Sequence, residues 1–197
     1  MTRQLILASS SQPRQRQLQR LKMPFSIGIP DVDETPLENE SAKQLVLRLA
    51  EVKTRKVAES YADAVLIGAD QVGILDGKII CKPLNYENAI EQLQNVSGKK
   101  VDFLVGLCVL DSKTQHLQLE LETFSVTFRA LTRPMIEYYL QNEDALNCAG
   151  SFKAEGLGVA LIKEFHDTDF SALVGLPLVR LIDMLEKVGV SPLKGMV

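Results

Sequence analysis

The sequence predicts an α/β fold with a mixed sheet, because short apolar runs alternate with helical patterns along the chain. Leu5–Ala8 and Val65–Ile67 are short and wholly apolar, which is typical of buried strands. Asp76-Gly77 separates two further apolar runs, which indicates a hairpin and hence an antiparallel part of the sheet. The 197 residues, 46% of them hydrophobic, suit a single domain, residues 1–197, that can be two-lobed.

The first forty residues predict two short strands with a helix between them. Leu5–Ala8 is the first strand, and Pro13 opens a helix over residues 14–22, since its missing N–H is harmless in a first turn. Residues 25–29 form the second strand, and the acidic stretch 30–40 is a loop.

A longer helix and a central strand follow. Ser41 and Gln44 form a capping-box pattern, and the helix that they begin runs to about Ser60. We place four of its residues near one face: Leu45, Leu49, Val52 and Lys56. Val65–Ile67 is a buried strand that ends in the sequence "GADQ".

The rest of the chain predicts the elements that complete the sheet. They are a hairpin around Asp76-Gly77, a helix over residues 85–96, antiparallel strands at 101–110 and 115–130, a helix begun at Thr132, a loop and strand within residues 148–162, and a last helix over residues 177–188. Within 115–130 the apolar residues are at odd positions up to Leu121 and at even positions from Phe124. One face of a strand cannot bury both sets without an extra residue, which predicts a bulge near Glu122-Thr123.

Composition excludes several classes of protein. A formal net charge of −3 argues against a protein that holds nucleic acid by bulk electrostatics. Three scattered cysteines match neither a zinc spacing nor a disulfide framework, and there is no signal peptide or run of about 18 apolar residues. We therefore expect a cytoplasmic protein with no membrane partner. The P-loop and dinucleotide fingerprints and the nucleophile motif of serine hydrolases are absent.

Three groups of polar residues remain as candidate sites. The first is the serine-rich turn after the first strand, where backbone N–H groups, Ser11 and Arg14 could bind phosphate; an ordinary turn is the alternative. The second is made of carboxylates, which attract a hard divalent cation. Asp70 follows a buried strand, where α/β sites usually lie. Asp31, Asp33 and Glu34 are in the acidic loop and could equally be solvated.

The third group consists of lysines and their neighbours. Lys53 is on a helix, where a solvated side chain is the more common outcome. Lys82 precedes a proline that directs the chain, and Lys153 and Glu155 lie in a glycine-rich stretch that allows close approach to a ligand.

These residues fall into motifs that resemble the Maf family of nucleotide pyrophosphatases. The stretches "LILASSSQPRQ", "VDET", "RLAEVK", "IGADQV", "CKP", "CAGSFKAEG" and "LVGLP" occur in the order found in that family, over roughly residues 4 to 190. The resemblance implies a fold like that of inosine-triphosphate pyrophosphatases, a mixed twisted sheet with flanking helices and two lobes around a cleft. It also implies cleavage of a nucleoside triphosphate to the monophosphate and pyrophosphate with a divalent metal, Mg²⁺ or Mn²⁺, and a possible homodimer.

The resemblance also implies roles for residues. By this resemblance, Asp70 would activate the attacking water, and Glu34 and Asp70 would place the metal, with Asp33 as an alternative helper. The phosphate-binding set is Ser11, Arg14, Lys53 and Lys82.

Three positions indicate the branch of the family that acts on 7-methyl-GTP: Pro13, Gln71 and Glu155. A carboxylate at 155 can accept from the two N–H groups of guanine and balance the charge of the methylated base. The opening motif departs from the family at Gln12 and Pro13, and Cys81, where glycine is usual, is expected to be a small packing residue. The chain has no Trp, so stacking on the base would fall to Phe or Tyr.

We therefore expect a 7-methyl-GTP pyrophosphatase. The alternatives are a dTTP/UTP pyrophosphatase and a nucleotide-binding regulator of cell division without catalysis. The presence of Asp70, Lys82 and Glu34 disfavours the regulator.

Overall fold

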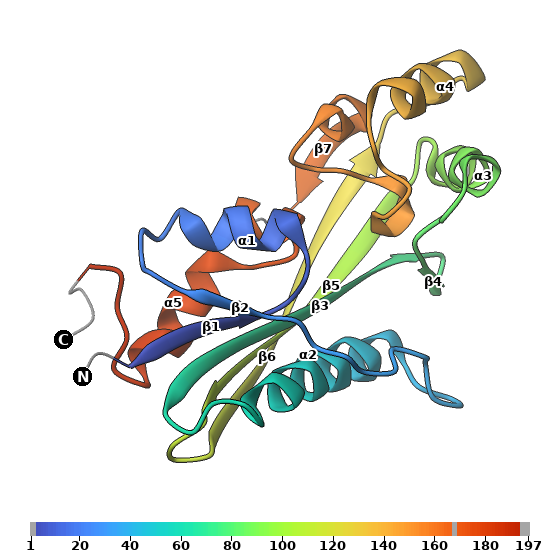
Figure 1. Ribbon diagram of the computed structural model, residues 1–197. Coiled ribbons are helices and arrows are strands. Elements are labelled where there is room, and N and C mark those ends of the chain that lie inside the picture. Colours follow the sequence, from blue (N-terminus) through green and yellow to red (C-terminus); the bar gives the residue numbers. More distant parts are fainter. Residues whose placement is uncertain (1–2, 167–168, 194–197) are drawn as a thin grey trace. The chain divides into compact units, whose positions relative to one another are not determined.

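The computed structural model describes residues 3–166 and 169–193 and confirms the α/β fold (Figure 1). The strands are β1 (Gln4–Ala8), β2 (Ser26–Gly28), β3 (Ala64–Leu75), β4 (Lys78–Ile80), β5 (Lys100–Asp111), β6 (His116–Phe128) and β7 (Ile162–His166). The α-helices are α1 (Gln12–Gln19), α2 (Ala42–Ala58), α3 (Tyr86–Val96), α4 (Arg133–Asn142) and α5 (Leu178–Glu186). Short 3-10 helices are η1 (Ala149–Ser151), η2 (Leu157–Leu161) and η3 (Phe170–Val174). No helix in the described ranges is long and apolar enough to cross a membrane.

The sheet is mixed, as the hairpin predicted. Within the described residues it has seven strands in the order β2-β1-β3-β5-β6-β7, and β4 pairs with β3. β1 is parallel to both of its neighbours, whereas β3 with β4 and β6 with β7 are antiparallel. Asp76 and Gly77 both have positive φ, 51° and 78°, as the predicted tight turn requires.

The chain forms two compact units, which are described separately. The first contains the chain up to Asp70, residues 105–122 and the chain from Asp169 onward. The second contains residues 71–104 and those from Thr123 to the end of β7. β3, β5 and β6 each contribute residues to both units.

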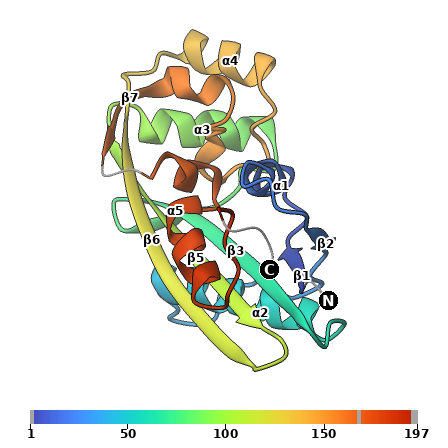
Figure 2. The same ribbon diagram turned by 90° about the vertical axis from the view of Figure 1, so that its left-hand side faces the viewer.

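In the first unit, helices cover both faces of the sheet. α2 lies on one face, where Val57 packs with Ile6 and Leu66, while α1 and α5 lie on the other (Figures 1 and 2). The apolar residues on that second face include Leu18 of α1 and Leu181 of α5. The first unit therefore has a core on each side of its strands.

The buried face of α2 differs from the prediction in one respect. The capping box of Ser41 and Gln44 is present, and Leu45 and Leu49 are buried as expected. Val52, however, is 37% exposed, whereas Lys53 is only 6% exposed. The buried face follows the i, i+4, i+8 spacing from Leu45, which reaches Lys53. The helix therefore buries this lysine, although the apolar character of Val52 had suggested that the valine would be buried.

Two glycines allow α2 to lie unusually close to the sheet. A Cβ atom on Gly68 of β3 would lie 2.0 Å from Thr54 Oγ1, and one on Gly106 of β5 would lie 2.2 Å from the Val46 carbonyl oxygen. Both distances are far shorter than any contact that a methyl group can make. Glycine is therefore required at each position by the helix that passes over it.

The second unit is built around aromatic packing. The rings of Phe103 and Phe124 stack with centroids 5.1 Å apart, and Phe152 packs against Phe103 at 5.8 Å. The predicted strand after the glycine-rich stretch is β7, and η1 and η2 occupy much of the predicted loop. The irregularity that the structure shows in β6 lies between Thr127 and Phe128, in its pairing with β7. The bulge near residues 122–123 stays a prediction.

Gly106→Ala should destabilise the protein, because the new methyl group would collide with the backbone of α2. We expect the free energy of unfolding to fall by about 1–3 kcal/mol, the usual range for overpacking. Urea unfolding followed by circular dichroism measures this change. Gly73→Ala is the matched control, since its Cβ would lie 3.3 Å from a Phe103 ring atom that can shift. An equal effect of the two substitutions would contradict the steric argument.

Candidate active site

Asp70, Lys53 and Glu34 form an ion-paired cluster in the first unit. Lys53 Nζ donates to Asp70 Oδ1 at 2.7 Å and lies 2.9 Å from Glu34 Oε2. The side chains of Lys53 and Asp70 are 8% and 10% exposed, whereas that of Glu34 is 54% exposed. The lysine thus joins a buried carboxylate to one that solvent reaches.

The contact of α2 with Gly68 explains how Lys53 reaches Asp70. Side chains alternate along a strand, so Gly68 and Asp70 face the same side of β3. Thr54 of α2 packs directly over Gly68, and its neighbour Lys53 is buried on the same side of the helix. The close approach at the glycine therefore brings the ammonium group within hydrogen-bond distance of the carboxylate two residues along the strand.

Asp70 does not follow a strand, as the sequence suggested, but lies within one. β3 runs from Ala64 to Leu75, so the predicted end at Ile67 is wrong. The sequence "GADQ" continues the strand because its partners change: β1 pairs with residues 64–67, and β4 pairs with residues 73–75. Asp70 lies beyond the carboxyl end of β1, so it is at an edge of the sheet only with respect to that neighbouring strand.

The acidic loop is held to α2 by an arginine that the sequence analysis did not single out. Arg48 donates to both oxygens of Glu40, at 2.6 and 2.8 Å, and to the Thr35 carbonyl at 3.1 Å. Glu40 also accepts from the backbone N–H of Leu37 at 3.0 Å. Pairing with Arg48 lowers the pKa of Glu40 to about 2. An arginine two turns into a capped helix, with a glutamate just before the cap, is the signal that could have indicated this pair.

The carboxylates of the acidic loop divide between two tasks. Glu34 reaches Lys53, but Asp33 accepts from the backbone N–H of Thr35 at 2.9 Å and so bonds within its own loop. Asp31 is exposed. Glu34 is thus the loop carboxylate that the structure brings to Asp70.

The serine-rich turn is more internally bonded than a simple phosphate site would be. Ser11 caps α1 by accepting from the Arg14 N–H at a long 3.5 Å, and its own N–H donates to Ser9 Oγ at 3.1 Å. Pro13 is in the first turn and has no N–H. The helix begins at Gln12, two residues before the predicted start. The N–H groups of Ser11 and Arg14 are therefore engaged within the turn, and Pro13 contributes none.

Arg14 is the cationic group of this turn. Its Nε donates to the carbonyl of Gly175 at 2.9 Å, which ties α1 to the segment after η3. Burial lowers the pKa of Arg14, and the negative charges of Asp70 and Glu34 oppose this shift. Arg14 therefore belongs to the same electrostatic environment as the Lys53 cluster.

Gln71 is the predicted specificity residue next to Asp70 in sequence. Because consecutive side chains of a strand point to opposite faces, the side chain of Gln71 lies on the face opposite to that on which Lys53 meets Asp70. Gln71 is half-buried.

Lys82 and Glu155 belong to the second unit, and both are exposed. The segment that carries Lys82 is fixed on each side, since Gln92 donates to the Cys81 carbonyl at 3.0 Å and the Leu84 N–H donates to the Leu146 carbonyl at 3.1 Å. Cys81 is exposed, so the expectation that it packs in the interior is wrong.

The possible metal ligands are oxygen atoms of Asp70 and Glu34. Lys53 engages Oδ1 of one and Oε2 of the other, so Oδ2 and Oε1 are the atoms that a cation could share. Among residues 3–166 and 169–193, no group of three or more His, Cys, Asp or Glu side chains is arranged to hold a metal. A pair of carboxylates suits Mg²⁺, which is usually bound through one or two carboxylates together with substrate phosphates.

Comparison with known proteins adds to this geometry. The family described as Maf-like protein matches residues 4–188 of the chain. A curated 7-methyl-GTP pyrophosphatase from Methylobacillus flagellatus is 48% identical over 186 residues, 94% of this chain and 97% of the relative. The solved structure of the Staphylococcus aureus Ham1 protein aligns with a TM-score of 0.47 and 15% identity over 65% of this chain and 73% of its own. The family match spans every predicted site residue.

The Arg48–Glu40 pair should make stability depend on pH in the acid range. Because the pKa of Glu40 is about 2 in the folded protein and 4.5 ordinarily, its stabilisation is present above about pH 4.5 and is lost as pH falls towards 2. Arg48→Met should therefore lower the urea midpoint at neutral pH, and its difference from the wild type should shrink over that interval. Arg55→Met, which breaks an exposed pair with Glu51 on the same helix, is the control and should change little. A constant difference for Arg48→Met would refute this role.

Proposed function

Because the chain belongs to the Maf family, we propose that it hydrolyses 7-methyl-GTP to 7-methyl-GMP and pyrophosphate. The observation that carries this proposal is the buried Asp70 carboxylate held by Lys53 in a cluster that also contains Glu34. The relative from Methylobacillus flagellatus, matched over almost its whole length, supports the choice of substrate.

Asp70 is the proposed general base. Its Oδ1 accepts a hydrogen bond from Lys53 Nζ, which fixes the orientation of the carboxylate. The other oxygen, Oδ2, is then the atom that accepts a proton from water. The water oxygen then forms a bond to the α-phosphorus, the bond from that phosphorus to the bridging oxygen breaks, and pyrophosphate leaves. A carboxylate whose position is fixed in advance needs no rearrangement when the proton moves.

Cationic and hydroxyl groups are proposed to stabilise the negative charge of the phosphates. In the first unit these are Ser11, Arg14 and Lys53, and Arg14 is already oriented by its bond to the Gly175 carbonyl. Lys82 of the second unit is added on the strength of the family motif "CKP". Guanidinium and ammonium groups act here by charge-assisted hydrogen bonds, which are stronger than neutral ones.

A divalent cation, Mg²⁺ or Mn²⁺, fits the two carboxylates. Glu34 would hold it through Oε1 and is the more accessible of the two, and Asp70 Oδ2 would share it through a lone pair other than the one that accepts the water proton. When bound, such an ion neutralises charge on the polyphosphate.

Base selection is assigned to Glu155, with Pro13 and Gln71 as further positions that differ from the dTTP/UTP branch. An ionised carboxylate accepts two hydrogen bonds from the guanine edge and favours the positive charge that methylation gives the base. Uracil and thymine present one N–H between two carbonyls, so they match a carboxylate less well.

Asp70→Asn should abolish most turnover while the fold is retained, since the amide keeps an oxygen for Lys53 but is not a base. We expect kcat for pyrophosphate release to fall by about a hundredfold to ten-thousandfold, the usual contribution of general base catalysis. Asp76→Asn, the same change in the exposed turn after β3, is the control. Circular dichroism checks the fold, and near-normal pyrophosphate release from Asp70→Asn would sink the mechanism.

The substrate is tested by comparing kcat/KM for 7-methyl-GTP, GTP, dTTP and UTP with Mg²⁺ or Mn²⁺. We expect 7-methyl-GTP to be the best substrate of the wild-type protein. A preference for dTTP or UTP would assign the chain to the other branch, and binding without turnover of any nucleotide would favour a regulator.

A further inference from the structure

Glu143 occupies an unusual position at the end of α4. Its side chain is 14% exposed, and its two oxygens accept from donors on a single turn of the glycine-rich stretch. Oε1 accepts from Lys153 Nζ at 2.5 Å, and Oε2 accepts from the Leu157 N–H at 2.8 Å. One carboxylate therefore holds both ends of the turn whose middle residue is Glu155.

The turn packs closely against this carboxylate and against its own backbone. A Cβ atom on Gly156 would lie 2.1 Å from Glu143 Oε2, and one on Gly158 would lie 2.3 Å from the Lys153 carbonyl oxygen. The backbone N–H of Gly156 also donates to the Lys153 carbonyl at 3.2 Å. Contacts within the turn and with Glu143 thus fix the path of residues 153–158.

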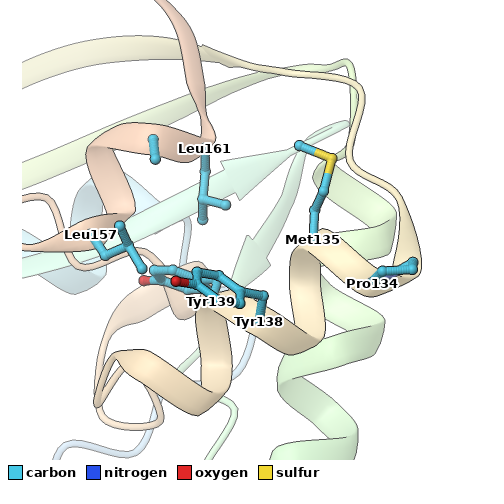
Figure 3. A pocket seen from close by; sticks show the side chains of 7 residues that line it. Pro134, Met135, Tyr138, Tyr139, Leu157 and Leu161 are labelled. Carbon is cyan, nitrogen blue, oxygen red and sulfur yellow. The ribbon is translucent and has the colours of Figure 1, made fainter.

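An apolar pocket borders the helix that follows this turn. A pocket of about 340 Å³ lies between α4 and η2, the helix that follows the turn (Figure 3). Its lining residues are Pro134, Met135, Tyr138, Tyr139, Leu157, Ala160 and Leu161. α4 and η2 are thus not packed closely over the whole of their contact, and Glu143 supplies a polar contact between α4 and the turn.

Tyr139 provides a second polar contact from the same helix. Its hydroxyl donates to the Ser151 carbonyl at 3.0 Å and accepts from the Lys153 N–H at 3.2 Å. The chain entering the turn is therefore fixed by Tyr139, and the turn itself is fixed by Glu143.

Glu143 also pairs with the charged side chain that is nearest to Glu155 in the sequence. Lys153 is two residues from Glu155, yet its ammonium group is paired with Glu143. This pairing, opposed by burial, raises the pKa of Lys153 and lowers that of Glu143. Glu155 itself is exposed. The direct partner of the ammonium group is therefore Glu143, while Glu155 acts on it only through its charge.

We propose that Glu143 is a positioning residue for base selection: it holds the turn 153–157 and pairs with Lys153 so that Glu155 can receive the methylated guanine. This inference rests on the function proposed above. Glu143 acts through Glu155 and not on the phosphates, so its removal should affect nucleotide affinity and leave the chemical step intact.

The first test is Glu143→Gln, with Glu137→Gln as the matched control. Glu137 is on the same helix, and its ion pair is with Arg133 of that helix, at 2.6 Å, and not with the turn. We expect KM for 7-methyl-GTP to rise about tenfold, as loss of a charged hydrogen bond predicts, with kcat nearly unchanged. The KM for dTTP should change by less than about twofold, which is too small a change in KM to be distinguished from none. Equal losses for both nucleotides, or a fall in kcat alone, would overturn the proposal.

The decisive test repeats Glu143→Gln in a Glu155→Gln background. If Glu143 acts through Glu155, adding Glu143→Gln to the Glu155→Gln variant should raise KM by less than about twofold. The reason is that the effects of residues in one network are not additive. A full effect of Glu143→Gln in the absence of the Glu155 carboxylate would refute the proposal. If Glu143→Gln fails to fold, Lys153→Met breaks the same ion pair from its other side and should raise KM in the same selective way.

Failure of the proposed function can be told apart from failure of this inference. The wild-type comparison of nucleotides decides the function. The cycle of Glu143 and Glu155 variants is then measured with whichever nucleotide the wild type prefers, by KM and by calorimetric dissociation constants that need no turnover. Additive effects would refute the role of Glu143 whatever the substrate is.

Discussion

The ion pair between Lys53 and Asp70 depends on how closely α2 lies against the sheet. Removing two charges from water costs several kcal/mol per ion, and only good geometry recovers this cost. The 2.7 Å contact is possible because Gly68 lets the helix approach β3 at the level of Thr54. If the helix lay farther away, Asp70 would carry an unpaired charge in a buried strand. Glycine, helix and ion pair are thus one structural arrangement.

Both units hold an acidic residue in place with a fixed opposite charge nearby. In the first unit, Lys53 takes one oxygen from each of two carboxylates and leaves the others for water or a cation. In the second unit, Glu143 pairs with the ammonium group of Lys153 on the turn that carries Glu155. In each case, an ion pair fixes the position of a carboxylate or of the turn that carries one.

Local patterns predicted much of this structure correctly because their physical causes are local. The capping box of Ser41 and Gln44 and the turn at Asp76-Gly77 depend on backbone conformation within a few residues, and both are present. Two expectations about neighbours farther along the chain were wrong. β3 continues past Ile67 because it exchanges partners, and Lys53 rather than Val52 is on the buried face of α2. Neither the change of strand partner nor the rotation of a helix is encoded in a short window of sequence.

The sequence by itself determined the fold class, the main elements and the chemical types of the candidate site, because periodicity, caps and turns report local preferences. It also identified Asp70, Glu34 and Lys53, although it regarded a lysine on a helix as more commonly solvated. Only the tertiary structure decided that Lys53 is buried against both carboxylates, that Arg48 holds the acidic loop through Glu40, and that Glu143 fixes the turn around Glu155. Each of these contacts joins residues from different elements, and its energy depends on distances and burial that only packing establishes.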